Sequence, residues 1–228
     1  MRILLASGLC ALLMSAGLPR AVGQKAPDES SELALHVSLE LRKGDQWQGV
    51  DPQTVFHNGD AIRFRFVASV GGYLYVLNHS SDGEASWLFP LPQASQTSRV
   101  EPGQDYLVPG AKGAFVVGGR AGFDVTYWIL SPIPMPTGEL APPTPGSQPS
   151  TLEPRCRAET LRARGLCVDE RAGPRAVTRP ERPPLEALQG KSLVSRDLKF
   201  QTQNDSTRIS LASPHAGVIV YEFLIAHN

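Results

Sequence analysis

Residues 58–90 most constrain what this chain can fold into, because they combine two turn signals with strand-forming segments. The turn at Asn58-Gly59-Asp60 launches a segment in which apolar and charged side chains alternate. Gly71-Gly72 then reverses the chain into residues 73–77, which are apolar on both faces. Asp82-Gly83 reverses it again into a third segment that ends at a proline. This pattern predicts a β-meander whose middle strand is covered on both sides.

Strand patterning also occurs on either side of this meander. Residues 33–41 alternate strictly between apolar and polar side chains, which is typical of a half-buried antiparallel strand. Residues 218–226 are almost wholly apolar and must be buried. We therefore predict an all-β fold, an antiparallel immunoglobulin-like β-sandwich. Residues 32–130 would form its core, and residues 191–228 would supply the closing strands of the same domain.

The composition changes abruptly at Ser131. Prolines are frequent up to residue 150, and proline cannot donate the hydrogen bonds of a sheet. Residues 151–165 have the composition of a helix, and a second Pro/Arg-rich run precedes a predicted short helix at 185–189. We interpret residues 131–190 as a long Pro-rich, partly helical insertion, whose first twenty residues cross the surface without joining a sheet.

The amino-terminal residues have the features of an export signal. Residues 1–23 contain Arg2, a short apolar core and a small-residue cleavage site, Ala21-Val22-Gly23. The apolar run is too short for a comfortable transmembrane helix, so we predict no membrane span after cleavage. Residues 24–31 form a polar, flexible lead-in. We expect a periplasmic or extracellular protein.

Cys156 and Cys167 are the two cysteines that remain after cleavage of the signal. Export and an even number favour a disulfide. A continuous helix between them would separate their Cα atoms by about 16 Å, whereas a disulfide allows about 4.4–6.8 Å. Either the helix is short and Gly165 folds the chain back, or the bond does not form; we favour the bridge.

The ordered motifs of the core resemble a known family. Gly59-Asp60-x-Ile62, the strand 72–77, Gly83 and Leu88-Phe89-Pro90 occur in the order and spacing of the bacterial domain-of-unknown-function family DUF4384. Pro102-Gly103, Pro109 and the strand that begins at Phe123 continue the pattern, so the resemblance covers about Leu33 to Pro132. It implies a secreted or envelope β-domain in a bacterium, and it carries no catalytic residue.

Sequence motifs for catalysis and metal binding are absent. No two of the five histidines have a metal-ligand spacing, and no nucleophile motif such as G-x-S-x-G occurs. Asp60 is expected to fix its turn by accepting backbone N–H groups. The polar residues 79–84 are expected to form a hairpin turn, not a calcium site, because they lack the ligand number of a calcium loop. We predict no cofactor and no metal.

Binding is therefore the favoured function. Because 22 basic and 22 acidic residues balance, we expect no nucleic-acid partner. Trp128 and Asp124 share the more polar side of one strand and Arg63 and Arg65 point outward from another, so these four are the predicted ligand-binding residues. We expect a non-catalytic secreted or envelope module that binds a protein or a glycan. The alternatives are a secreted hydrolase built from residues remote in sequence and a structural envelope protein.

Overall fold

The computed structural model describes residues 33–91, 97–135, 152–156, 158, 160–161, 165–177, 188, 190–211 and 217–228. Within these residues the chain is built from fifteen strands in two sheets, which confirms the predicted all-β class. The predicted signal at residues 1–23, the lead-in at 24–31 and most of the Pro-rich run, 136–150, lie outside the described residues.

The first sheet is antiparallel throughout. Its strand order is β13 (Lys199–Gln203), β14 (Ser206–Leu211), β1 (Leu33–Lys43), β4 (Ala61–Ala68) and β8 (Asp105–Val108). Two short strands extend it, β2 (Gln46–Val50) on β1 and β9 (Phe115–Val116) on β4. The β1 side chains that alternation assigns to the interior, such as Leu35 and Val37, are buried.

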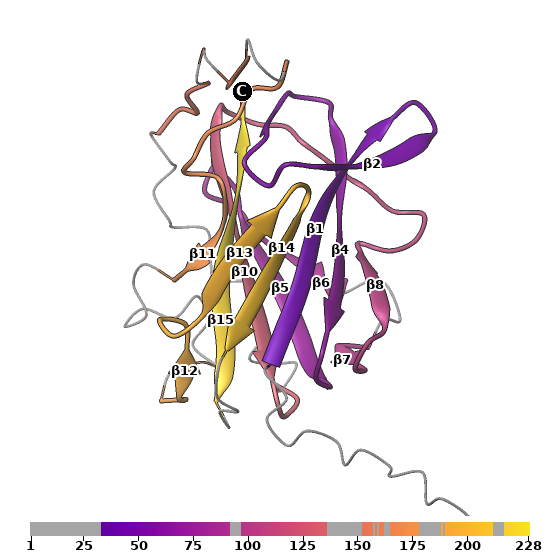
Figure 1. Cartoon of the computed structure of the whole chain (residues 1–228), viewed down its shortest axis with the longest axis vertical. Coiled ribbons are helices and arrows are strands. Elements are labelled where there is room, and N and C mark those ends of the chain that lie inside the picture. The colour runs from indigo at the N-terminus through magenta and orange to yellow at the C-terminus, as the bar shows by residue number, and fades with distance from the viewer. Residues whose placement is uncertain are drawn as a thin grey trace, which may run out of the picture.

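The second sheet lies behind the first and contains the carboxy-terminal strand (Figure 1). Its strand order is β11 (Gly173–Ala176), β15 (Val218–His227), β10 (Gly122–Ser131), β5 (Gly72–His79) and β6 (Ala85–Phe89). Three short strands extend it, β12 (Leu193–Val194) and β3 (Val55–Phe56) on β15 and β7 (Arg99–Val100) on β5. Only the β12 and β3 pairings are parallel. The three strands predicted over residues 58–90 are present as β4, β5 and β6, but they do not form the predicted meander, because β5 pairs with β6 whereas β4 lies in the other sheet.

The main core lies between the two sheets and is rich in aromatic rings. Trp128 of β10 contacts Phe64 and Phe66 of β4 edge to face, with ring centroids 5.1 and 5.8 Å apart. It also stacks on Tyr221 of β15 at 5.8 Å. Such ring pairs stabilise a core by about 0.5–1.5 kcal/mol beyond the area that they bury. The predicted burial of residues 218–226 is confirmed, because every residue of β15 is buried.

A second apolar cluster covers the outer face of the second sheet. Leu77, Ile129 and Val220 point away from the first sheet and are at most 1% exposed. Met135 and Leu188, from the predicted insertion, pack over them. The insertion also contributes β11, which pairs with β15, so part of the segment predicted to be Pro-rich and partly helical joins the second sheet.

Residues 46–57 show little strand pattern of their own, yet they are not a plain connection. They form β2, which pairs with β1, and β3, which runs parallel to the end of β15. Phe56 fills the core at 1% exposure, as expected for an aromatic residue in such a segment. Trp47 instead lies on the outer side of the first sheet, where it stacks on a guanidinium group.

The predicted disulfide is present between Cys156 and Cys167, whose Cα atoms are 5.0 Å apart. Of the residues between them, Ala158, Thr160 and Leu161 have helical conformation in the described part. Gly165 has a φ of +65°, and its N–H donates to the carbonyl of Leu161 at 2.9 Å. A left-handed glycine therefore ends the helical turn and folds the chain back, which is the alternative that permits the bridge.

The Asp169 carboxylate holds two parts of the insertion together, and the Asp169 N–H donates to the carbonyl of Gln53 in the β-domain at 2.9 Å. Its carboxylate accepts the backbone N–H groups of Arg155 at 2.6 Å and Arg171 at 2.9 Å. It also accepts a hydrogen bond from the Arg171 guanidinium. Burial alone raises the pKa of Asp169, but these hydrogen bonds outweigh burial and lower its pKa to about 2. The adjacent Val168 forms an isolated antiparallel β-bridge with Thr54, which joins the insertion to the segment before β3.

Candidate functional site

Two of the predicted ligand-binding residues, Arg63 and Arg65, are held in an ion-pair network on the outer face of the first sheet. Arg63 Nε donates to Glu40 Oε2 at 2.5 Å, and Arg65 Nε donates to Glu40 Oε1 at 2.8 Å. Arg65 also pairs with Asp105, and the Arg63 guanidinium lies 4.2 Å from the ring centroid of Trp47. Burial alone raises the pKa of Glu40, but the hydrogen bonds from both arginines outweigh it, so its pKa lies below the ordinary value.

Arg63 and Arg65 lie on the outer face as predicted, but neither guanidinium is free. Arg63 is only 7% exposed, because it lies between Glu40 and the Trp47 ring. The side chain of Arg65 is 38% exposed, but its guanidinium is already shared between two carboxylates. A ligand would have to displace internal partners to reach either residue.

Trp128 does not lie on an exposed face, as its predicted ligand-binding role requires. Trp128 is 1% exposed in the core between the sheets, and its Nε1 donates to Thr126 Oγ1 at 3.0 Å. Thr126 in turn donates to the carbonyl of Phe223 at 3.0 Å. The more polar side of β10 therefore faces the first sheet. The sequence misled because the opposite side of β10 is also covered, so both faces of the strand are buried.

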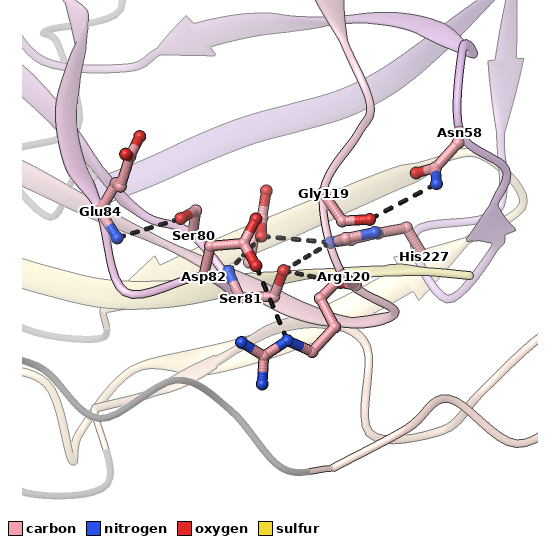
Figure 2. Close-up of polar contacts among 9 residues, drawn as sticks. Asn58, Ser80, Ser81, Asp82, Glu84, Gly119, Arg120 and His227 are labelled. Atoms are coloured by element: carbon pink, nitrogen blue, oxygen red, sulfur yellow. Dashed lines mark hydrogen bonds and ion pairs between the residues drawn. The ribbon is translucent and has the colours of Figure 1, made fainter.

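Asp124, the fourth predicted residue, lies on the same inner face as Trp128, near the start of β10. One carboxylate oxygen, Oδ1, accepts the backbone N–H of Ser81 at 2.7 Å and lies 3.2 Å from His227 Nε2. Ser81 Oγ donates to the carbonyl of Arg120 at 2.8 Å and lies 3.4 Å from the same histidine nitrogen. Figure 2 shows Ser81, Arg120 and His227 converging from three segments that are distant in sequence.

Two glycines allow this convergence. A Cβ added to Gly122 would meet the Ser81 Cβ at 2.9 Å, and a Cβ added to Gly119 would meet the Asp82 carboxylate at 2.5 Å. Gly119 also has a φ of +98°, a backbone conformation that residues with a side chain rarely adopt. The predicted turn at 79–84 is confirmed by the bonds Gly83 N–H to Ser80 O and Ser80 N–H to Glu84 O. The turn at Asp60 is confirmed too, since its carboxylate accepts the His57 N–H at 2.9 Å.

Ser81, His227 and Asp124 bring together the residue types of a catalytic triad but lack its geometry. A triad places the serine and the carboxylate on opposite nitrogens of the imidazole. Here both contact Nε2, while Nδ1 is buried without a partner in the described part of the chain. Ser81 is 1% exposed and its hydroxyl is committed to the Arg120 carbonyl. The group holds the turn and the hairpin against the end of β15.

A pocket of about 320 Å³ opens between the two sheets beside this group. Its polar lining is Asn78 of β5, Ser86 of β6 and Asp124 of β10, all from the second sheet. The other lining residues are apolar: Ile62, Leu88, Ala114, Phe115, Val116, Val117 and Ile225. At the rim, Val116 of β9 is 69% exposed, the highest value among the exposed large apolar side chains of the described residues.

The polar wall of this pocket is positioned by the register of the second sheet. Asn78 lies opposite Ser86 in the β5–β6 pairing and opposite Thr126 in the β5–β10 pairing. Asp124 is two residues from Thr126 and therefore points to the same face. Asn78 Oδ1 is buried and has no hydrogen-bond partner within the described residues. Such an unpaired buried acceptor is rare.

A second group of titratable side chains lies on the outer face of the second sheet. Burial raises the pKa of Tyr127 to about 12, with a further contribution from Glu222, and burial lowers the pKa of His79. The two rings pack edge to face at 5.2 Å, and Glu222 pairs with Arg175 at 3.0 Å. Both rings are neutral near pH 7 and act as packing groups.

Sequence reasoning missed most of this pocket. It singled out Asp124 but not Asn78, Ser86 or Val116, because side chains from four strands meet only when the two sheets are paired. One signal was available: Asn78 is the first polar residue after the apolar run 73–77, on the side that alternation assigns to Val76 and Leu74. An uncharged polar residue that follows apolar core residues on the same side of a strand indicates that the core ends at that position.

The fold places this chain among the all-β proteins with two sheets. Residues 55–134 match the family model of DUF4384, a domain of unknown function. The match confirms the resemblance inferred from the motifs and covers every pocket residue except Ile225. No curated protein and no solved structure matches the chain.

Two further findings concern the described residues. No group of three or more His, Cys, Asp or Glu side chains in that part of the chain could hold a metal ion. No helix there is long and apolar enough to cross a membrane.

Proposed function

We propose that this chain is a non-catalytic binding module that engages a protein partner at the pocketed end of its two sheets. The observation that carries the proposal is the pocket itself. It combines a wall of hydrogen-bonding groups with apolar side chains and is bordered by the exposed Val116. Binding sites have this mixed character, in which apolar surface supplies affinity and a few polar groups fix orientation.

A protein partner is favoured over a glycan. Glycan recognition was expected from aromatic rings on an open sheet face, and the best of these, Trp128, is buried. The pocket lies at the lower end of the usual range for ligand sites, about 300–1,000 Å³, which suits one side chain better than an extended sugar chain. Asp124 remains a predicted contact residue.

The enzyme alternative receives less support. Acid–base or nucleophilic chemistry needs two or more reactive groups that converge on one accessible space. Among the described lining residues of the pocket, Asp124 is the only ionisable one. Ser81 and His227, the nearest candidates for chemistry, are buried and tied to each other and to Asp124. The structural-protein alternative rests on the Pro-rich run, most of which lies outside the described residues.

We place the module in the periplasm or outside a bacterial cell, as a secreted or envelope protein. The Cys156–Cys167 disulfide supports this proposal, because disulfides persist in oxidising compartments. The signal-like residues 1–23 support it from sequence alone. We further propose that the two sheets form an immunoglobulin-like sandwich and that this sandwich carries a long, partly helical insertion.

Site-specific photo-crosslinking tests the proposed function. A photo-reactive residue replaces Val116 in one variant and Ile133 in a matched control, in the cells that produce the protein. Ile133 is also β-branched and 59% exposed, and it follows the opposite end of β10. We expect a discrete crosslinked protein from position 116 and not from position 133. Identical products from both positions, or none from 116, would contradict a partner at the pocketed end.

A further inference from the structure

The polar wall of the pocket presents acceptors that lack donors. Asp124 Oδ1 is occupied by the Ser81 N–H and by His227, but Oδ2 has no donor among the described residues. Asn78 Oδ1 is buried and unpaired in the same part of the chain. Ser86, opposite Asn78 across β5 and β6, is exposed and adds a hydroxyl oxygen. The Asp124 carboxylate and the Ser86 hydroxyl therefore offer oxygens on one side of a small space, and the Asn78 side chain lines the same wall.

The rest of the pocket is apolar and carries no compensating charge. Ile62, Phe115 and Val116 come from the first sheet, and Leu88 and Ile225 come from the second. No Lys or Arg lines the pocket within the described chain. Arg120, the arginine labelled in Figure 2, does not line the pocket; its side chain is 60% exposed and faces Asp82 at 3.8 Å. A ligand that fits this lining has an apolar stem and a positively charged end.

We propose that the pocket binds an alkylammonium group, namely the side chain of a lysine that a protein partner inserts between the sheets. The inference rests on the proposed function and specifies what that site recognises. An ammonium carries three donors, which can point to separate oxygens such as those of Asp124 and Ser86. Its four-carbon stem would lie along the apolar lining, as lysine stems do on apolar surfaces.

The same geometry disfavours arginine. A guanidinium binds carboxylates best as a planar fork that uses both oxygens. At Asp124, Oδ1 already accepts the Ser81 N–H and contacts His227, so only Oδ2 is left for a ligand. A fork would lose one of its two bonds, whereas an ammonium needs only one carboxylate oxygen. The pocket should therefore discriminate between the two cations.

Binding of small blocked amino acids tests the proposal. The probes are the acetyl, methylamide derivatives of lysine, arginine and norleucine, titrated into the isotope-labelled protein while the amide signals of residues 78, 86 and 124 are followed. Norleucine keeps the apolar stem and removes the charge. We expect lysine to bind about tenfold or more tightly than norleucine, as a charge-assisted hydrogen bond predicts, and more tightly than arginine.

Variants connect this preference to the named residues. Asp124→Asn should abolish the preference for lysine over norleucine, whereas Asp45→Asn, the same charge change in an exposed turn, should leave it unchanged. Because Asp124 also holds Ser81, Ser86→Asp gives an independent measurement at an exposed position. Its added carboxylate should tighten lysine binding about twofold to fivefold, the effect of a solvent-exposed ion pair.

Two outcomes would overturn the proposal. One is equal binding of lysine and norleucine to the wild-type protein. The other is a folded Ser86→Asp variant that binds lysine no more tightly. If either occurs while the crosslink from position 116 persists, the partner site stands and its lysine specificity fails. If lysine binds selectively and position 116 yields no crosslink, the pocket recognises ammonium groups and the partner site at this rim fails.

Discussion

The outer faces of the two sheets differ in what covers them. On the first sheet, Glu40, Arg63 and Arg65 form a charged network on the side away from the core, and neighbouring positions such as His36 face solvent. On the second sheet, the outer face is an apolar cluster covered by residues of the insertion. The first sheet is therefore amphipathic, whereas the second is buried on both sides.

This difference shows when alternation identifies the inside of a strand. In β1 the polar side meets water and the apolar side meets the core, so the pattern is interpreted correctly. In β10 the side that carries Ile129 is the more apolar, yet it faces the covering insertion, and the side that carries Trp128 and Asp124 faces the other sheet. Alternation shows which face of a strand is the more polar. The more polar face is the outer one only when one of the two faces is exposed to solvent.

Truncating adjacent residues of β10 tests whether both of its faces are core. We expect Trp128→Ala to lower the free energy of unfolding by about 3–5 kcal/mol and Ile129→Ala to lower it by about 2–5 kcal/mol. The Trp128 substitution removes three aromatic contacts. The Ile129 side chain is 0% exposed, so its truncation leaves a cavity beneath the insertion. Urea denaturation measures both values.

The exposed Val116→Ala is the control and should stay within about 0.5 kcal/mol of the wild type. An Ile129→Ala value as small as this control would show that the insertion covers the second sheet only loosely. A small value for Trp128→Ala would contradict the aromatic core itself.

Much of the fold follows from sequence for physical reasons. The strands β1, β4, β5, β6 and β15 combine length with strong patterning, and the glycine turns between them are local signals. The disulfide was predicted because Gly165 can adopt the left-handed conformation that folds the chain back. The short strands β2 and β3 were missed, because a pairing of a few residues is decided by the partner strand and leaves little local pattern.

The candidate site was predictable only in part. Asp124 was selected because it shares the more polar side of its strand with Trp128, and that side is the inner face on which the pocket lies. His227 and Ser81 are 146 positions apart and meet only through the pairing of β10 with β5 and β15, which no local rule supplies. The arginines were misassigned, since their partner Glu40 belongs to a different strand, and cross-strand register cannot be deduced from alternation alone.

Glu40→Gln tests the charged face of the first sheet. We expect it to lower the free energy of unfolding at pH 7 by about 1.5–3 kcal/mol, the usual contribution of hydrogen bonds to a charged group. The loss also leaves Arg63 buried beside Trp47 without its carboxylate. Glu222→Gln on the second sheet is the comparison. Because Glu222 pairs with one arginine and Glu40 with two, we expect the smaller effect at Glu222.

The pH dependence of this effect has a definite sign. The pKa of Glu40 is lowered in the folded protein from an ordinary value of 4.5, so its stabilising contribution is complete above about pH 5 and is lost as the pH falls through the lowered pKa. The difference between wild type and Glu40→Gln should therefore shrink in acid. A difference that is constant from pH 7 to pH 3 would show that the charge of Glu40 contributes nothing.

The smallest expected effect is a gain in stability at Tyr221, on the inner face of β15. Its ring is 1% exposed, and its hydroxyl has no hydrogen-bond partner among the described residues. Burial raises the pKa of Tyr221 well above its ordinary value, so the hydroxyl stays protonated. The adjoining void, about 10 Å³, is lined otherwise by apolar side chains and offers a water too few partners.

Tyr221→Phe removes this unpaired hydroxyl and keeps the ring. We expect the free energy of unfolding to rise by about 1 kcal/mol, the lower end of the cost of a buried unsatisfied group. Tyr75, on the covered outer face of the same sheet, is the matched control. Its hydroxyl accepts the Met135 N–H at 2.9 Å and the Ser98 hydroxyl at 3.3 Å, so Tyr75→Phe should lower stability by about 1 kcal/mol. Urea midpoints with unchanged slopes measure both changes, and the same sign for the two variants would refute the assignment of one satisfied and one unsatisfied hydroxyl.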